Sequence, residues 1–411
     1  MTMKNKLFGM IAILAVIVFS ACNEEAIIGT SPITFALCSN IITINDGNAA
    51  TGIRVTASGT ASGEIQVDGL PENINADING NIIIFTGTRP KPREAAITAS
   101  GIILNITRQD ITKTLTLNVN LQPFPYITTG VSGLEMSWIP PGTFMMGSPT
   151  DEPGHFPEER QHQVTLTSGF WMMRTTVTRG QWRTLKGMDT VLEWENEPND
   201  HDNLPATHVV WYDAIVFANR MSIKAGLTPV YEMETTTAGV WCTNPDNWGN
   251  VPTWAGDPNL ARWDAVRKLD GATGYRLPTE AQWEYACRAG TTTAFNDGIT
   301  NNHNDTAAIA KLGWFFGHPL GDSLREGGQR QPNAWDLYDM HGNVWEWVWD
   351  WAGAYPDGHA IDPTGPNSGE VRRMRGGAWA SPASSLRSAR RFTQEPYSWE
   401  SFFGFRLVRP F

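Results

Sequence analysis

The sequence has few basic residues for its length, and this deficit limits the partners that the chain can have. Its 31 Lys and Arg residues are outnumbered by 42 Asp and Glu residues among 411, which gives a formal net charge of −11. A nucleic-acid-binding protein needs a basic field, so we expect no nucleic-acid partner. Charged residues make up only 18% of the chain and hydrophobic residues 41%, a balance typical of folded domains rather than of disordered chains.

Several catalytic signatures are also missing from the sequence. Its eight histidines are scattered, and no two of them have the spacing of a zinc-binding motif. No glycine-rich phosphate loop, nucleophile elbow or set of kinase motifs occurs. Only four cysteines are present. Two of them, Cys242 and Cys287, could pair as a disulfide in an oxidising compartment, or Cys287 could be a small buried thiol on a helix.

The N-terminus has the pattern of an export signal. A basic start precedes an apolar run over residues 7–19, which is too short to span a bilayer as a mature helix. Small residues then precede Cys22, as at a bacterial lipoprotein cleavage site. We therefore predict a signal peptide over residues 1–22 and a lipid on Cys22; the alternative is a plain signal peptide with a chance cysteine. The acidic residues that follow resemble the surface-export signal of Bacteroidetes lipoproteins, so we predict a tether over residues 23–32 and a lipid-anchored, surface-exposed location on a bacterial outer membrane.

Residues 33–122 predict a β-sandwich of the immunoglobulin-like type. Short β-branched runs, such as Ile41–Ile44 and Thr112–Val119, are separated by turn residues, such as Asn45–Gly47. About seven short strands at this spacing are typical of such a sandwich. The segment has no charged cluster and no histidine, so we expect it to be a spacer between the membrane and the next domain; an adhesive role is the alternative.

A second domain is predicted over residues 127–411, after the stiff Pro123–Pro125 linker. Tryptophan is absent before Trp138 and frequent after it, which marks a change of composition at this boundary. The pattern predicts an α+β fold with few regular elements and long connections. The expected strands lie within residues 138–147 and 163–173, and the expected helices are 178–185, 212–224 and 279–288, the last with a capping box.

The most distinctive stretch of the second domain is Asn333–Trp351. Four tryptophans, at positions 345, 347, 349 and 351, alternate with other residues. A period of two places the four rings on one face of an extended strand. A tight turn with oxygen donors, from Asp339 to Asn343, directly precedes the rings. The stretch therefore predicts a buried aromatic strand beside a polar turn.

Five sequence blocks of this domain occur in the order and register of a known family. They are Pro141–Gly147, Tyr275–Ala286, Leu337–Trp347, Arg375–Trp379 and Gly404–Leu407. Together they resemble the formylglycine-generating enzyme, or sulfatase-modifying factor, domain over nearly all of residues 136–409. The resemblance implies a variant of the C-type lectin fold, mostly irregular, with calcium sites.

The resemblance also implies an activity that the residues of this chain do not support. Enzymes of the family oxidise a cysteine of a sulfatase to formylglycine with oxygen and copper, and they use two cysteines shortly after the Arg-Gly-Gly-x-Trp motif. Ser381 and Leu386 stand in these two positions here. Because a copper(I) ion requires soft thiolate ligands, we expect neither copper nor oxidase activity.

The residues that are present suit calcium better than copper. The resemblance implies one site made by the side chains of Asp339 and Glu346 and the backbone carbonyls of Gly342 and Val344. Such hard oxygen donors are the ligands that calcium prefers, so we predict a structural calcium ion. The alternative is an ordinary turn whose carboxylates face solvent. The second calcium site of the family maps poorly onto residues 313–325 and is not assigned.

The stretch 380–403 combines framework residues with the Ser, Tyr, Trp and Phe side chains that are typical of adaptable binding surfaces. It resembles the ligand-binding face of variable proteins made by diversity-generating retroelements; the alternative is sequence drift around an altered active site. We predict that a protein, peptide or glycan binds here. The predicted ligand-binding residues are Trp379, Ser381, Ser384, Arg387, Arg390, Tyr397, Trp399 and Phe402. Arg387 and Arg390 could equally be framework residues that pair with buried carboxylates.

Three hypotheses for function follow from the sequence. The one we prefer is a lipid-anchored surface protein whose second domain binds a ligand without catalysis. The second is an enzyme, either a formylglycine-generating oxidase or another reaction on the same scaffold. The third is a structural component of a surface complex, such as gliding or secretion machinery. One fold can support all three functions, so only the residues and geometry of the site can distinguish them.

Overall fold

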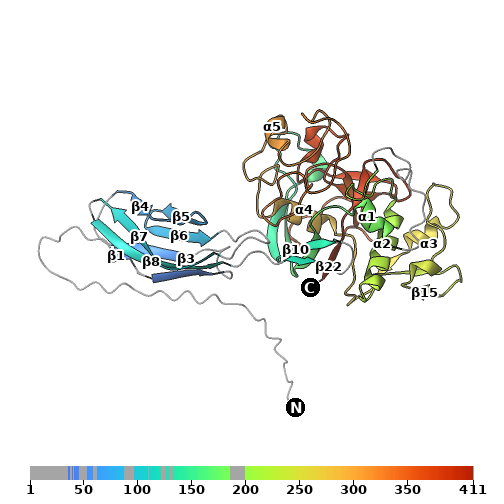
Figure 1. Cartoon of the computed structure of the whole chain (residues 1–411), viewed down its shortest axis with the longest axis horizontal. Coiled ribbons are helices and arrows are strands. Elements are labelled where there is room, and N and C mark those ends of the chain that lie inside the picture. The colour runs from blue at the N-terminus through green and yellow to red at the C-terminus, as the bar shows by residue number, and fades with distance from the viewer. Residues whose placement is uncertain are drawn as a thin grey trace, which may run out of the picture. The chain divides into compact units, whose positions relative to one another are not determined.

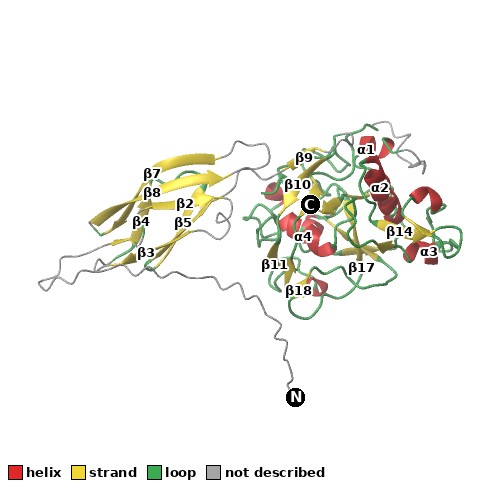
Figure 2. Cartoon of the chain, turned by 90° about the horizontal axis from the view of Figure 1, so that it is seen from below, coloured by secondary structure: helices red, strands yellow, loops and turns green. Residues whose placement is uncertain are grey.

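The computed structural model describes residues 36–37, 39, 41–45, 53–58, 63–87, 97–109, 111–121, 126–128, 133–185 and 200–410. The chain divides into two compact units, with the main division between residues 123 and 124. The described part of the first unit is made of strands, whereas the second combines short strands, short helices and long loops (Figure 1, Figure 2).

The first unit contains two four-stranded sheets, with the strand orders β1-β3-β6-β5 and β2-β8-β7-β4. Alternate side chains of both sheets, such as Ile44, Phe85 and Leu117, are fully buried in one shared apolar core. This arrangement is that of two facing β-layers; its classification as immunoglobulin-like stays a prediction. The strands are β1 (Ala36–Leu37), β2 (Ile41–Asn45), β3 (Ile53–Ser58), β4 (Ile65–Asp68), β5 (Ile74–Asn79), β6 (Ile82–Gly87), β7 (Ile97–Arg108) and β8 (Ile111–Leu121).

The second unit has four small sheets, with the orders β22-β13-β10-β9, β11-β12-β18, β15-β14-β16 and β20-β19-β17-β21. The strands predicted within residues 138–147 and 163–173 are present as β10 to β13. The strands are β9 (Tyr126–Thr128), β10 (Glu135–Ile139), β11 (Gly142–Met146), β12 (His162–Leu166), β13 (Phe170–Met173), β14 (Tyr231–Glu234), β15 (Trp241–Cys242), β16 (Arg267–Lys268), β17 (Trp345–Trp351), β18 (Ala360–Ile361), β19 (Arg372–Arg375), β20 (Phe392–Gln394), β21 (Phe403–Phe405) and β22 (Val408–Pro410).

The three predicted helices are also present. The capping box forms as expected, because the Thr279 hydroxyl accepts from the Gln282 N–H over 3.1 Å and the Gln282 side chain accepts from the Thr279 N–H over 3.1 Å. The helices are α1 (Arg179–Arg183), α2 (Trp211–Lys224), α3 (Leu260–Asp264), α4 (Glu280–Arg288) and α5 (Thr306–Ile309), with 3-10 turns at Pro157–Glu159, Pro245–Asn247 and Ala383–Leu386.

Strand β17 lies at the centre of the second unit and separates two parts of its core. It pairs antiparallel with β19 and parallel with β21. The rings of Trp345, Trp347 and Trp349 pack with the apolar cluster around α2, whereas Val348 packs with the cluster around α4. The period-two pattern therefore places three of the four predicted rings against this cluster, and the opposite face meets α4. Trp351 lies beyond a register shift between β17 and β19, with its ring centroid 3.3 Å from the Arg372 guanidinium.

Two predictions fall on residues outside the described part of the chain. The signal peptide over residues 1–22, with its lipidation site Cys22, and the tether over residues 23–32 lie there, as does Cys38. In the segments that the structure does describe, every helix is too short or too polar to cross a membrane. The lipid anchor and the surface location remain predictions.

Candidate functional site

The predicted calcium residues lie in a tight turn that ends where β17 begins. Asp339, Gly342 and Asn343 all have left-handed backbone angles, with φ of 57°, 128° and 69°. At Gly342 an added Cβ would lie 2.1 Å from the carbonyl oxygen of Trp314, so only glycine fits. The Asn343 N–H donates to the same carbonyl over 3.0 Å. The turn is therefore pressed against the backbone around Trp314.

The two carboxylates of this turn have different surroundings. Both oxygens of Glu346 accept from Arg406 over 2.7 Å, and one also accepts from the Trp283 indole over 2.8 Å. Asp339 accepts from the Gly328 N–H through Oδ2 over 2.7 Å, while its buried Oδ1 has no hydrogen-bond partner in the described part of the chain. Burial raises the pKa of Asp339 to about 6, and the nearby Glu346 charge adds to this rise.

An unsatisfied buried oxygen next to a second carboxylate is a suitable place for a hard cation. Within the described segments no three His, Cys, Asp or Glu side chains form a metal-binding group. An ion held by Asp339 and Glu346 would therefore also need the carbonyl oxygens of Gly342 and Val344, as the resemblance implies. The residues fit a calcium ion of the structural kind, whose charge would compensate the buried carboxylates. The calcium site stays a prediction.

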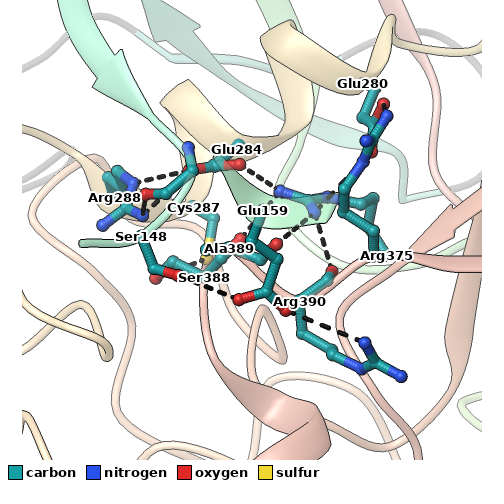
Figure 3. Close-up of polar contacts among 12 residues, drawn as sticks. Ser148, Glu159, Glu280, Glu284, Cys287, Arg288, Arg375, Ser388, Ala389 and Arg390 are labelled. Carbon is teal, nitrogen blue, oxygen red and sulfur yellow. Dashed lines mark hydrogen bonds and ion pairs between the residues drawn. The ribbon is translucent and has the colours of Figure 1, made fainter. Parts of the chain in front are cut away.

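A network of buried arginines and glutamates supports the backbone that follows β19 (Figure 3). Arg375 is ion-paired with Glu284, and its two terminal nitrogens donate to the carbonyl oxygens of Ser388, Ala389 and Arg390 over 2.7–2.9 Å. One buried guanidinium thus fixes three consecutive peptide groups. These bonds hold the segment 388–390 in place, because a carbonyl oxygen away from water requires a hydrogen-bond donor.

Arg387 belongs to the same kind of support, which corrects its prediction as a ligand-binding residue. Its side chain is 0% exposed and is paired with Glu152 over 2.7 Å and with Glu159 over 2.8 Å. A ligand cannot reach a guanidinium that is enclosed in this way. The alternative stated from the sequence, a framework arginine that pairs with buried carboxylates, is the arrangement that the structure has.

Arg390 differs from Arg387 in its exposure. Its side chain is partly exposed, lies 3.9 Å from the ring centroid of Phe156 and is 3.3 Å from the carboxylate of Glu158. The guanidinium also lies 3.8 Å from the buried Glu159 carboxylate, so only its contact with Glu158 is a surface pair of the kind that contributes little to stability. Arg390 therefore remains a candidate ligand contact.

The segment 395–403 is attached to the domain by its backbone. The Glu400 carbonyl accepts from the N–H of His208 over 3.0 Å, the Pro396 carbonyl from that of Trp211 over 2.9 Å, and the Phe402 carbonyl from that of Trp345 over 2.8 Å. These bonds fix the main chain, and the side chains of Tyr397, Phe402 and Phe403 also pack against the apolar core, whereas Trp399 is 39% exposed. This is the arrangement of a loop that carries binding residues on a fixed scaffold.

Aromatic side chains of this segment reach the surface. The Trp399 side chain is 39% exposed and packs against the ring of His208 at a tilt of 45°, with centroids 5.5 Å apart. Tyr397 and Phe402 are half-buried, and Phe402 makes a T-shaped contact with the half-buried Trp379, with centroids 6.4 Å apart. We use the name aromatic surface for Trp379, Tyr397, Trp399 and Phe402. The half-buried Ser384 is the remaining predicted ligand contact.

One neighbour of this surface was not found from the sequence. The Phe316 side chain is 62% exposed, and its N–H donates to the Ser381 carbonyl over 2.9 Å, which brings the loop after Trp314 beside residue 381. In the sequence, the only local sign of this feature is that Trp314–Phe316 is a run of three aromatic residues. Its position beside residue 381 is a long-range contact that no local pattern could have indicated.

The second unit is similar in sequence and fold to known proteins. The model of the Sulfatase-modifying factor enzyme 1-like domain matches residues 127–411. The chain belongs to this family. It is 32% identical over 235 residues to Chaperone protein LppX of Paenibacillus barcinonensis, covering 53% of this chain and 71% of the relative. It is 30% identical over 300 residues to the Formylglycine-generating enzyme of Thermomonospora curvata, covering 66% of this chain and 91% of the relative. Among solved structures, Treponema denticola variable protein 1 matches with a TM-score of 0.60 and 29% identity, over 70% of this chain and 98% of that chain.

In this chain, the two positions that the resemblance assigns to the cysteines of the oxidase are occupied by residues that pack in the interior. The Ser381 hydroxyl accepts from the Trp345 indole N–H over 3.1 Å and is buried, so this predicted ligand contact faces the interior. Leu386 is fully buried in an apolar cluster with Phe295 and Phe315. A hydroxyl engaged with an indole and an aliphatic side chain do not fit a copper(I) ion.

The described cysteines do not replace the missing pair. Cys242 and Cys287 are both free, so the disulfide considered from the sequence does not form in the structure. Cys287 is fully buried on α4, with its Sγ 3.6 Å from the Ser388 hydroxyl, and burial raises the pKa of its thiol to about 12. A neutral, enclosed thiol is a poor nucleophile and a poor metal ligand.

Proposed function

We propose that this protein is a lipid-anchored surface protein whose sulfatase-modifying-factor domain binds a protein, peptide or glycan and does not oxidise it. The observation that carries the proposal is the division of roles in the segment 395–403. Its backbone is bonded to two other segments, residues 208–211 and the start of β17, while Trp399 is exposed and Tyr397 and Phe402 are half-exposed. Rigid aromatic side chains supply large contact areas at a low cost in conformational entropy.

The positions of Ser381 and Leu386 support a binding role rather than the oxidase role. Neither side chain can supply a thiolate, and both are packed into the interior. Arg390 and Ser384 would give polar contacts at the edge of the aromatic surface. The calcium ion at Asp339 would stabilise the turn before β17, and a lipid on Cys22 would hold the chain at the membrane with the first unit as spacer.

An oxidase assay tests the non-catalytic part of the proposal. The protein spanning residues 23–411 is incubated with copper, oxygen and a cysteine-bearing sulfatase peptide, and the peptide is analysed by mass spectrometry. We expect no formylglycine, because the chain lacks the cysteine pair. Formylglycine formation at a rate above that of copper alone would overturn the proposal and favour the enzyme hypothesis.

A binding screen tests the positive part of the proposal. Glycan and peptide arrays are probed with the same fragment, and each hit is retested with Trp399→Ala. We expect a loss of binding of at least about fivefold, since truncation of a tryptophan at the centre of an interface costs more than about 1 kcal/mol. Trp254→Ala is the matched control, because Trp254 is 59% exposed and lies outside the aromatic surface. Equal effects of the two variants would contradict the assignment.

The likeness to a protein named as variable suggests how the surface could be diversified. We infer that sequence changes are tolerated at the exposed and half-exposed side chains of residues 380–403, whereas the buried Ser381, Leu386 and Arg387 are framework residues. A search of the genomic DNA for a template repeat and a reverse transcriptase near the gene tests this. Their absence would favour drift without directed diversification.

A further inference from the structure

A separate pocket of about 240 Å³ lies beside the start of α4, and none of its lining residues belongs to the aromatic surface. Its apolar wall includes Leu166 and Phe170, and its polar wall includes Lys268 and Arg276. The pocket is therefore concave, partly apolar and lined by two cationic side chains. These are the general features of a site for a small ligand.

Lys268 is the first unusual feature of the pocket. In the described part of the chain its ammonium group makes no hydrogen bond and no ion pair, and it lies 4.9 Å from the ring centroid of Trp349. Its pKa is lowered to about 8, mainly by burial and in addition by the charge of Arg276, while the charges of Asp350 and Asp270 act in the opposite direction. A half-buried lysine without a partner is costly unless a counter-charge is supplied.

Arg276 is a second cation of this pocket that lacks an ion-pair partner among the described residues. One of its terminal nitrogens donates to the Leu277 carbonyl over 3.1 Å and to the Gln282 side chain over 2.8 Å. No carboxylate of the described residues forms an ion pair with this guanidinium. Its other donors remain available at the pocket, and burial lowers the pKa of the group. The guanidinium can therefore still offer a charge-assisted hydrogen bond to an acceptor.

Among the described residues, neither nearby acid forms an ion pair with these two cations. Asp362 lines the pocket, and both of its oxygens accept from Thr167, over 2.9 Å from the N–H and 2.5 Å from the hydroxyl. Asp350 is buried and accepts from the Glu280 N–H over 2.8 Å, and burial raises its pKa to about 7. The pocket is thus lined by two cations and one carboxylate that is bonded to Thr167.

We propose that this pocket binds the carboxylate or sulfate group of a small ligand, held between Lys268 and Arg276. The oxygens of either group are acceptors that match a guanidinium and an ammonium. The partly exposed Pro363 and Pro410 would contact the carbon skeleton that carries the anionic group, with the buried Leu166 and Phe170 behind them. The site is independent of the aromatic surface, so either proposal can fail without the other.

Lysine NMR tests the proposal directly. Reductive methylation of the 23–411 protein with ¹³C-formaldehyde labels each lysine without removing its charge, and the Lys268 signal is assigned by its loss in Lys268→Met. The pKa of Lys268 is then measured in chloride, sulfate and glucuronate at equal ionic strength. Sulfate or glucuronate should raise it by about one pH unit relative to chloride, the effect of an opposite charge in contact.

The anions distinguish the two chemical forms of the ligand. A rise with glucuronate alone indicates a carboxylate, a rise with sulfate alone indicates a sulfate ester, and a rise with both supports a shared oxyanion site. The exposed Lys311 is the internal control and should respond equally to all three anions. An identical pKa of Lys268 in all three salts, or an unchanged response in Arg276→Gln, would overturn the proposal.

Discussion

The indole N–H of Trp345 donates a hydrogen bond to the hydroxyl of Ser381 over 3.1 Å, and both side chains are buried. Ser381 stands where the resemblance implies the first of two cysteines. A hydroxyl is a stronger acceptor than a thiol, so serine at this position satisfies the indole better than cysteine would. This position therefore supports β17, and the domain uses it for packing rather than for metal chemistry.

Replacement of Ser381 by alanine is predicted to destabilise the domain. Ser381→Ala would leave the Trp345 indole N–H buried and unpaired, and we expect the free energy of unfolding to fall by about 1–3 kcal/mol. Chemical denaturation measures the change. Ser384→Ala, in a half-buried serine of the same segment, should change the free energy by less than about 0.5 kcal/mol. Equal losses in both variants would contradict the role of Ser381.

A larger loss of stability is predicted when Arg387 is replaced. Arg387→Met would leave Glu152 and Glu159 buried without their cation, and removal of one partner of a buried ion pair costs about 3–5 kcal/mol. Thermal and chemical unfolding of the variant measure this cost. Arg390→Met should cost less than Arg387→Met, because its closer contact is with the exposed Glu158 and its distance from Glu159 is 3.8 Å, whereas Arg387 donates to both oxygens of Glu159. A larger loss for Arg390 than for Arg387 would refute the assignment of framework and surface roles.

The buried Glu280 predicts a stability loss in acid. Burial alone would raise the pKa of this carboxyl, but the charge and hydrogen bonds of Arg391 outweigh burial and hold the pKa at about 2. Because the folded pKa lies below the ordinary value of 4.5, the resulting stability is present above about pH 4.5 and is lost as the pH falls toward 2. The difference in unfolding free energy between wild type and Glu280→Gln should therefore narrow over this range.

Urea denaturation at a series of pH values measures the Glu280 effect. The control is Glu158→Gln, which changes an exposed carboxylate and should differ little from wild type at any pH. A difference for Glu280→Gln that stays constant from pH 4.5 to 2 would show that the ion pair with Arg391 does not govern the acid response.

Calcium removal is predicted to lower the melting temperature. The orphaned oxygen of Asp339 and the carboxylate of Glu346 would lose their shared cation, and the folded state would lose the binding free energy of the ion. Differential scanning fluorimetry with and without a calcium chelator measures the shift. In Asp339→Ala the chelator should have no effect. If chelation leaves the wild-type melting temperature unchanged, the calcium site is wrong.

The local features of the second domain could be predicted from the sequence because neighbouring residues determine them. The alternation of tryptophans from position 345 to 351 required a strand, and the Thr279–Gln282 capping box required a helix start. The five family blocks also indicate the fold, and the replacement of two cysteines by Ser381 and Leu386 argues against an oxidase from the sequence alone.

Exposure and pairing were decided by the tertiary structure alone. Arg387 and Arg390 are three residues apart in the same segment, yet the first is enclosed by Glu159, 228 positions earlier in the chain, and the second reaches solvent. Lys268 and Arg276 share a pocket only because β16 and the start of α4 meet there. Burial and electrostatic partners depend on contacts between distant segments, so the sequence determined the scaffold and the fold determined which side chains face a ligand.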